Sequence, residues 1–205
     1  MEKYVKKFSF SALLIAFAAC FVFLFSACGD NNPITKSEFL TMCDNVNAHI
    51  ASQEEKISAG DKDDFDQLKY IIANISSFSE LSEENLDKIF EAISKNSDHK
   101  FVVDNGSGLS VAQVMKKNNG VQIIAGQKDY PAYTFKTFIE FNFSTKKVGK
   151  IEVSYFHTDS TSTYRIITLN GSTITTETKT DSSLNDIQKS LISSVTKDDV
   201  VVTNN

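Results

Sequence analysis

Residues with the side chains of a hydrolytic triad stand close together at His157, Asp159 and Ser160. Such a site needs a nucleophilic hydroxyl, a base that takes its proton and a carboxylate that orients the base. Triads are assembled from separated segments of a chain, whereas these residues share one short run rich in Ser and Thr. Runs of this composition are typical of loops. We therefore expect a loop here and a protein without enzymatic activity, with a hydrolase as the weaker alternative.

The acidic segment Asp61–Asp66 begins like a calcium-binding loop. In such a loop, alternate positions supply oxygen ligands and a glycine allows the sharp turn. Phe65 stands where an oxygen ligand is needed, and Asp66 stands in place of the glycine. Carboxylates are also favourable in the first turn of a helix, because they interact with the positive end of its dipole. The segment therefore predicts the start of a helix.

The sequence predicts neither a zinc site nor a phosphate site. His49, His99 and His157 lie far apart, and no two cysteines are separated by two residues, so the usual zinc spacing is missing. Backbone amides in Gly106–Gly108 could contact an anion, but the segment matches no phosphate-binding loop. We accordingly expect no metal and no cofactor.

Three amphipathic helices are predicted within residues 35–99. Apolar side chains recur there every three or four residues, which places them on one side of each helix. Thr35 and Glu38 form a capping box at the first start, and Asp61 and Ser82 can cap the second and third helices. The apolar positions are Phe39, Cys43, Val46 and Ile50, then Phe65, Leu68, Ile71, Ile72 and Ile75, then Leu86, Ile89, Phe90 and Ile93.

From residue 100 onward the apolar period falls to two, which predicts strands. Tyr133–Phe143 and Ile151–Tyr155 are expected to form one hairpin. A second hairpin is expected to turn at Asn170-Gly171, because both residues tolerate the positive φ of a tight turn. A two-residue loop at this position would place Ile167 opposite Ile174.

Shorter strands at Phe101–Val103 and Val121–Ala125 flank a segment predicted as a helix over Val111–Asn118. A last amphipathic helix is predicted over Leu184–Val195, and an edge strand over Val200–Val202. The predicted fold class is therefore α+β. An N-terminal three-helix region is followed by a mostly antiparallel β-meander with one inserted and one C-terminal helix.

One face of the predicted sheet could form a binding surface. Phe138 lies on the side of its strand away from the expected core residues, and Phe156, Tyr164 and Ile166 could align with it on neighbouring strands. If exposed, these side chains would form a small apolar patch rimmed by polar groups. Because the three helices need a surface on which to bury their apolar sides, we expect them to cover this face.

The N-terminus resembles the signal peptide of bacterial lipoproteins. Three lysines precede the apolar run Phe8–Phe25, and Leu24–Cys28 is similar to a lipobox. The resemblance implies cleavage before Cys28 and acylation of its thiol. It covers only this targeting segment. The alternative is an uncleaved anchor, because Phe8–Ala27 is long enough as a helix to cross a hydrocarbon core of about 30 Å, and the lysines would still place later residues outside the cytoplasm.

We expect residues 1–27 to be a signal peptide, 28–34 the lipidated cysteine with a linker, 35–99 a helical region, and 100–205 a sheet region of the same compact unit. Cys20 would leave with the signal peptide and Cys28 would carry lipid, so Cys43 has no partner for a disulfide. Cys43 shares an apolar helix face and is expected to be a buried thiol.

The chain is acidic, with 26 acidic and 21 basic residues, and removal of the signal segment takes away three lysines but one glutamate. Nucleic acid and anionic lipid surfaces are therefore poor partners. We expect an exported lipoprotein, anchored to a bacterial membrane, that acts as a non-enzymatic binding module for another envelope or extracellular protein. The alternative is a carrier or sensor of a small apolar ligand held against the aromatic sheet.

Overall fold

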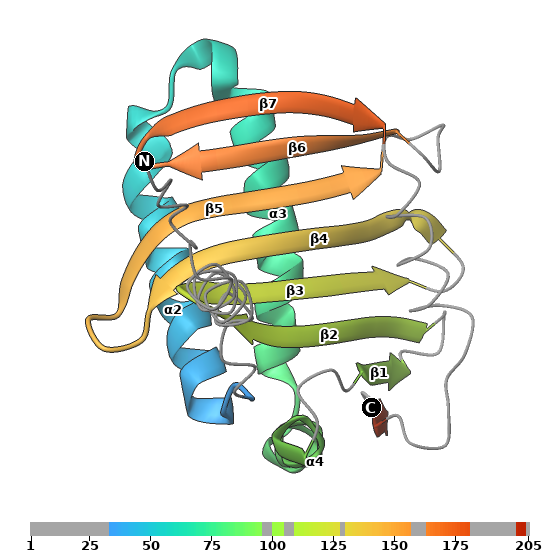
Figure 1. The fold of residues 1–205 in the computed structure, drawn as a ribbon. Coiled ribbons are helices and arrows are strands. Elements are labelled where there is room, and N and C mark those ends of the chain that lie inside the picture. Colours follow the sequence, from blue (N-terminus) through green and yellow to red (C-terminus); the bar gives the residue numbers. More distant parts are fainter. Residues whose placement is uncertain are drawn as a thin grey trace, which may run out of the picture.

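The computed structural model describes residues 33–95, 100–104, 109–127, 130–156, 163–180 and 200–203. Within these ranges three α-helices precede eight strands, and all eight strands belong to one sheet (Figure 1). The predicted α+β class is confirmed. None of the helices in the ranges given is long and apolar enough to span a membrane.

The predicted helices are α2 (Lys36–Gln53), α3 (Lys62–Ser77) and α4 (Glu83–Lys95). The 3₁₀ turns η1 (Glu54–Lys56) and η2 (Ala59–Asp61) connect α2 to α3, and η3 (Phe78–Glu80) follows α3. All the apolar positions predicted on the three helices are buried. The spacing of apolar residues was therefore sufficient to place the helices and their buried sides.

The ends of two helices show how local side chains fix them. In the predicted capping box, Glu38 N donates to Thr35 Oγ1 at 3.2 Å, and Thr35 N donates to Glu38 Oε2 at 3.0 Å. Asp61 precedes α3 but makes no capping bond. Its carboxylate accepts a hydrogen bond from Ser58 Oγ at 2.6 Å instead, so it stabilises the turn before the helix.

The sheet has the strand order β7-β6-β5-β4-β3-β2-β1-β8. Neighbouring strands are antiparallel except for β1 and β8, which are parallel and form one edge. The predicted edge strand at the C-terminal end is thus confirmed as β8. The strands are β1 (Lys100–Asp104), β2 (Leu109–Lys117), β3 (Gly120–Gln127), β4 (Tyr130–Asn142), β5 (Lys147–Phe156), β6 (Thr163–Asn170), β7 (Thr173–Thr180) and β8 (Val200–Thr203).

The segment predicted as an inserted helix is strand β2, so that prediction is wrong. Val114 pairs with Ile123 on β3, and the antiparallel pairing continues along the strand. Ala112 and Val114 are buried on the helix-covered face of the sheet, whereas Val111 and Met115 pack on the other face. A strand that is apolar on both faces loses its alternation, and its periodicity can no longer be distinguished from that of a helix.

The hairpin of β6 and β7 is present, but its turn lies one residue later than predicted. Asn170 pairs with Thr173, which leaves Gly171 and Ser172 as the loop, and Gly171 has a φ of +59°. A glycine at the first loop position is characteristic of a type II′ turn. Leu169 therefore faces Ile174, and the predicted pairing of Ile167 with Ile174 is wrong.

Helices α2 and α3 lie behind the sheet in Figure 1, and α4 lies at the β8 end. They cover the face that carries Ile139 and Ile151, not the face of Phe138, so the predicted position of the helices is wrong. The pairing of residues across the strands explains why the helices cover this face of the sheet. Ile139 faces Val121 and Ile151, whereas Phe138 faces the polar Gln122 and Glu152, so only the first face offers an unbroken apolar row.

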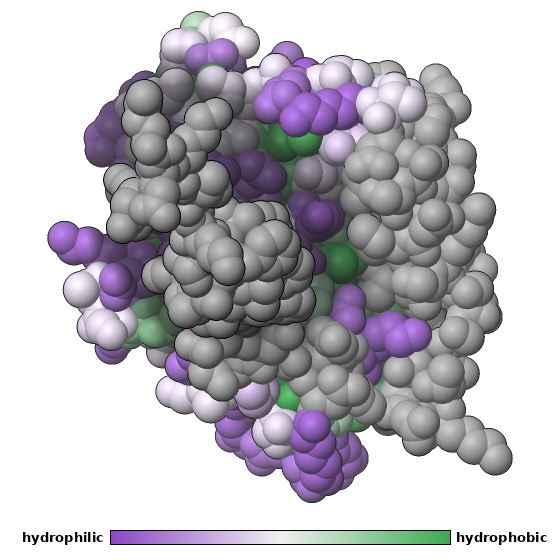
Figure 2. All heavy atoms as spheres, viewed as in Figure 1, coloured by the Kyte–Doolittle hydropathy of each residue, from purple (hydrophilic) through white to green (hydrophobic). Residues whose placement is uncertain are grey.

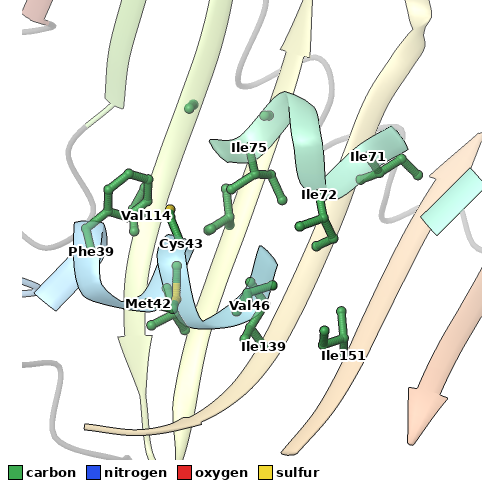
Figure 3. Packing of buried hydrophobic residues seen from close by; sticks show 14 of the residues in the cluster. Phe39, Met42, Cys43, Val46, Ile71, Ile72, Ile75, Val114, Ile139 and Ile151 are labelled. Carbon is green, nitrogen blue, oxygen red and sulfur yellow. The ribbon is translucent and has the colours of Figure 1, made fainter. Parts of the chain in front are cut away.

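The core lies between the helices and this face. Phe39, Met42, Cys43 and Val46 from α2 meet Ile71, Ile72 and Ile75 from α3 above Val114, Ile139 and Ile151 of the sheet (Figure 3). The ring of Phe39 also contacts that of Phe90 on α4, with 5.4 Å between centroids. The C-terminal helix predicted over Leu184–Val195 lies outside the described residues.

Candidate functional site

A hollow of about 460 Å³ opens at the end of the sheet where the β2–β3 and β4–β5 turns lie side by side. Phe143 and Val148 supply apolar surface, and most of the remaining side chains are polar. The polar lining residues are Lys116, Asn118, Asn119, Glu140, Asn142, Ser144 and Lys147. At the left of Figure 2, where the β4–β5 turn projects, hydrophilic and hydrophobic atoms accordingly lie next to each other.

Two turns with fixed backbones form the rim of this turn-end hollow. Asn118, with a φ of +38°, makes the β2–β3 turn between the paired residues Lys117 and Gly120. In the β4–β5 turn, Asn142 Oδ1 accepts a hydrogen bond from Thr145 N at 2.8 Å. Asparagine tolerates the left-handed region and bonds to nearby backbone groups, so it suits both turns.

Glu140 is held in place on one wall of the hollow. Asn119 Nδ2 donates to Glu140 Oε1 at 2.9 Å, and Lys150 N lies 3.4 Å from Oε2. The carboxylate can lie here because Gly149 has no side chain, since a Cβ atom at that position would be 2.9 Å from Glu140 Cδ. Gly120 likewise has no room for a Cβ, which would lie 2.1 Å from the carbonyl oxygen of Ile139.

Lys116 joins the hollow to the helices. Its ammonium lies 2.8 Å from Glu38 Oε1 at the start of α2 and 4.4 Å from the centroid of the Phe143 ring. Partial burial acts to raise the pKa of Glu38, but hydrogen bonds from Lys116 and Thr35 outweigh it and keep that pKa below its usual value. The ion pair joins the start of α2 to β2, and the contact with the Phe143 ring joins β2 to the β4–β5 turn.

The lining chemistry is suited to binding. Amides, a carboxylate, ammonium groups and a hydroxyl together offer hydrogen-bond donors and acceptors beside a phenyl ring. The lining residues include no histidine and no cysteine, and Ser144 is their only hydroxyl.

Three residues of the predicted binding surface lie on the sheet face without described helices. Phe138 is half-buried, and Tyr164 and Ile166 are each 8% exposed. Tyr164 pairs with Phe156, whose side chain lies outside the described part of the structure. Ile166 pairs with Ser154 and Phe138 pairs with Glu152, so the four predicted residues are spread over three cross-strand rows and do not line up in one.

The same face also carries an apolar cluster that the sequence reasoning missed. Val102, Val111 and Ile124 are buried there, with Met115 packed against them. The side chains of this cluster come from β1, β2 and β3. The cluster could be recognised only after β2 had been assigned as a strand.

Most of the other segments with candidate chemistry lie outside the described residues or serve the fold. His157–Ser160 and Gly106–Gly108 lie outside them, as does Cys28. Within Asp61–Asp66, Asp64 Oδ1 lies 2.9 Å from Arg165 Nη2, and Asp64 Oδ2 accepts a hydrogen bond from Thr176 Oγ1 at 2.6 Å. Where the chain is described, no three His, Cys, Asp or Glu residues are placed to hold a metal ion.

The turn-end hollow was missed because its first turn was interpreted as the end of the predicted inserted helix. A usable signal was present in Asn118-Asn119-Gly120, where turn-forming residues precede the alternating Val121, Gln122 and Ile123. Such a pattern favours a hairpin. Comparison of the chain with protein-family models, with curated proteins and with solved structures found no match.

Proposed function

We propose that the protein is an exported lipoprotein, anchored through an acylated Cys28, that binds a polar segment of another envelope or extracellular protein in the turn-end hollow. The observation that carries the binding role is a hollow of about 460 Å³ in which seven polar side chains lie beside apolar ones. The anchor is supported by the lipobox-like Leu24–Cys28. Two or more acyl chains on one cysteine hold a protein stably at a membrane, whereas one chain does so only marginally.

The walls of the hollow favour binding because they are already ordered. Glu140 is fixed by Asn119, and Lys116 by Glu38, so these side chains lose little freedom when a partner arrives. A preorganised site binds more tightly than one whose side chains must first be ordered. Lys147 is exposed at the rim and adds a positive charge toward solvent.

A polar partner suits this lining better than the alternative small apolar ligand. Such ligands bind in mostly apolar pockets with a few polar groups. Here seven of the eleven lining residues carry polar side chains, although apolar atoms of Phe141, Phe143 and Val148 still form a large part of the wall. The proposed occupant is therefore a loop or strand end that brings hydrogen-bonding groups of its own.

The binding role is tested with a photo-crosslinking amino acid at position 147 in the full chain, expressed in its host cells. We expect a defined protein adduct from position 147 and much less from position 146, which belongs to the same turn but does not line the hollow. Glu140→Gln should reduce the adduct at position 147, because it removes the fixed charge of the wall. Equal adducts from both positions would contradict a site in the hollow.

The anchor is tested separately by intact-mass measurement of the extracted protein. We expect cleavage before Cys28 and additional acyl mass on that residue. Cys28→Ser should abolish the acyl mass and, in detergent phase separation, move the protein from the detergent phase to the aqueous phase. An unmodified Cys28 in an uncleaved chain would instead support the N-terminal helix as an anchor.

A further inference from the structure

Strand β7 forms one edge of the sheet, so its outer side has no neighbour among the described strands. Every second residue of an antiparallel edge strand directs its N–H and C=O groups away from the sheet, where they can pair with another strand. Proteins usually protect such edges by a short strand, a proline, a bulge or several lysines. The other edge follows this rule, because β8 has only four residues.

β7 has little protection of this kind. Its eight residues pair with β6 in one continuous register without a bulge, and they include no proline and one lysine. Five of the eight are threonines, which favour strands. Residues 177–180 are all exposed, and Figure 2 shows hydrophilic atoms next to nearly neutral ones along the upper border, where β7 lies in Figure 1. Among the described residues, this polar edge has no neighbouring strand, so it can accept a strand from another chain.

We propose that β7 pairs antiparallel with β7 of a second copy of this chain, with the two-fold axis at Thr178. In this register Glu177 of each copy lies opposite Lys179 of the other, and Thr176 lies opposite Thr180. Opposite charges and threonine pairs directly across two strands both stabilise the pairing. The result is one continuous sheet through two copies, with the same surface used on both sides.

Charge selects this register among the neighbouring ones. An axis at Glu177 would place two glutamates opposite each other, which is unfavourable. An axis at Thr176 would place Glu177 and Lys179 opposite threonines and would lose both charge pairs. Within a single copy, Glu177 and Lys179 already lie on one face, with Lys179 Nζ 3.0 Å from Glu177 Oε2, so both charges lie along the edge that a second copy would meet.

The register is tested by cysteine trapping in the full chain, in whichever cell fraction holds the protein. Residues directly opposite in antiparallel strands have Cα atoms about 4.5–5.5 Å apart, within the range of about 4.4–6.8 Å that a disulfide needs. Thr178→Cys should therefore yield a disulfide-linked dimer under mild oxidation. Thr175→Cys, on the same strand but three residues from the axis, would be about 20 Å from its copy and should yield about tenfold less dimer.

Charge variants in the Thr178→Cys chain provide the decisive control. Glu177→Lys alone and Lys179→Glu alone should each lower the dimer yield about tenfold, because like charges then face each other twice. A mixture of the two variants should restore the dimer, as should the double swap within one chain, because opposite charges again face each other. The proposal is overturned if Thr175→Cys dimerises as well as Thr178→Cys. It is also overturned if the charge variants leave the dimer yield unchanged.

Self-pairing at β7 does not depend on the proposed function. The turn-end hollow lies on β2 to β5, and none of its lining residues belongs to β7. An adduct at position 147 without a dimer at position 178 would support the first proposal and overturn the second, and the reverse result would do the opposite.

Discussion

His49 on α2 has a buried polar atom without a partner. Its Nε2 atom is buried and makes no hydrogen bond within the described part of the chain. Burial disfavours the charged imidazolium, and the nearby charge of Lys56 acts in the same direction, so the pKa of His49 lies below its ordinary value of 6.5. The folded protein therefore holds this histidine neutral under conditions in which the unfolded chain would protonate it.

We expect the stability contributed by His49 to be fully present above pH 6.5 and to be lost as pH falls through the lowered pKa of the folded state. Between the two pKa values the unfolded state binds more protons than the folded state, so the free energy of unfolding decreases as the pH decreases. Urea unfolding at pH 7.5 and 5.5 measures the difference. His49→Gln has no group that titrates in this range and should lose less stability between these pH values. An equal loss in both proteins would contradict the assignment.

At the residue scale, local patterns were predictable where neighbours in sequence interact. The capping box of Thr35 and Glu38 could be predicted because the two residues are three apart on one helix turn. The hydrogen bond that Lys116 donates to Glu38 could not be predicted, because it joins residues 78 positions apart. His49 offered no signal of its own, since the burial of one ring nitrogen depends on how the helices pack.

At the element scale, Asp64 links α3 to the sheet. Its two carboxylate oxygens bind Arg165 on β6 and Thr176 on β7, so one side chain joins three elements. Arg165 in turn lies near Tyr155 on β5, where burial outweighs the charge of Arg165 and raises the pKa of the Tyr155 hydroxyl. Asp64 and its partners Arg165 and Thr176 thus form a polar cluster at the edge of an otherwise apolar contact between helix and sheet.

Asp64→Ala should lower the free energy of unfolding by about 1.5–3 kcal/mol, the usual contribution of hydrogen bonds to charged groups. The loss arises because Arg165 and Thr176 would both lack their partner. Asp63→Ala provides the matched control, because Asp63 is an exposed neighbour in the same helix turn, and its effect should stay within about 0.5 kcal/mol. Urea denaturation of the two variants measures the difference, and equal effects would show that Asp64 acts only as a charge at the helix start.

The elements also show where sequence patterns stop being informative. Helices with one buried side were predicted, and so were strands with alternating polarity such as β5, where Ile151 and Val153 alternate with Glu152 and Ser154. β2 was not, because apolar residues on both of its faces imitate a helix. For the same reason the turn-end hollow was not predicted, because Asn118 and Asn119 then appeared to end a helix instead of forming the turn of a hairpin.

At the scale of the whole molecule, the helical and sheet regions contribute to the same core. Phe39 and Phe65 from the helices are at most 2% exposed, and they share one cluster with Ile139 and Ile151 of the sheet. Neither layer buries its apolar side without the other. We therefore expect residues 35–203 to unfold in one transition.

Phe39→Ala should lower the stability by about 3–5 kcal/mol and shift the far-UV and near-UV circular dichroism transitions together. The far-UV signal follows backbone structure and the near-UV signal follows the packing of aromatic side chains. Tyr70→Ala removes an aromatic ring that is 53% exposed on α3, so it should change the stability by about 0.5 kcal/mol or less. Two separated transitions in the Phe39→Ala protein would show that the layers unfold independently.

The face of the sheet on which the helices lie was a whole-molecule property that the sequence left open. Both faces carry aromatic or aliphatic residues, and the helices cover the face that forms an unbroken apolar row. This row crosses β3 to β7 through Val121, Ile139, Ile151, Leu169 and Ile174. Recognition of such a row needs the register of each pair, and the predicted register of β6 and β7 was itself wrong by two positions.

The parallel pairing of β8 with β1 has a consequence for how the chain is made. Val201 lies beside Val102, so this contact closes a loop of about a hundred residues. A polypeptide that emerges from a ribosome or an export channel in N-to-C order completes β1 long before β8 exists. Until then the strand at Lys100–Asp104 is an unprotected edge, open to chaperones and proteases. We therefore expect the chain to become more resistant to proteolysis only when β8 has paired with β1.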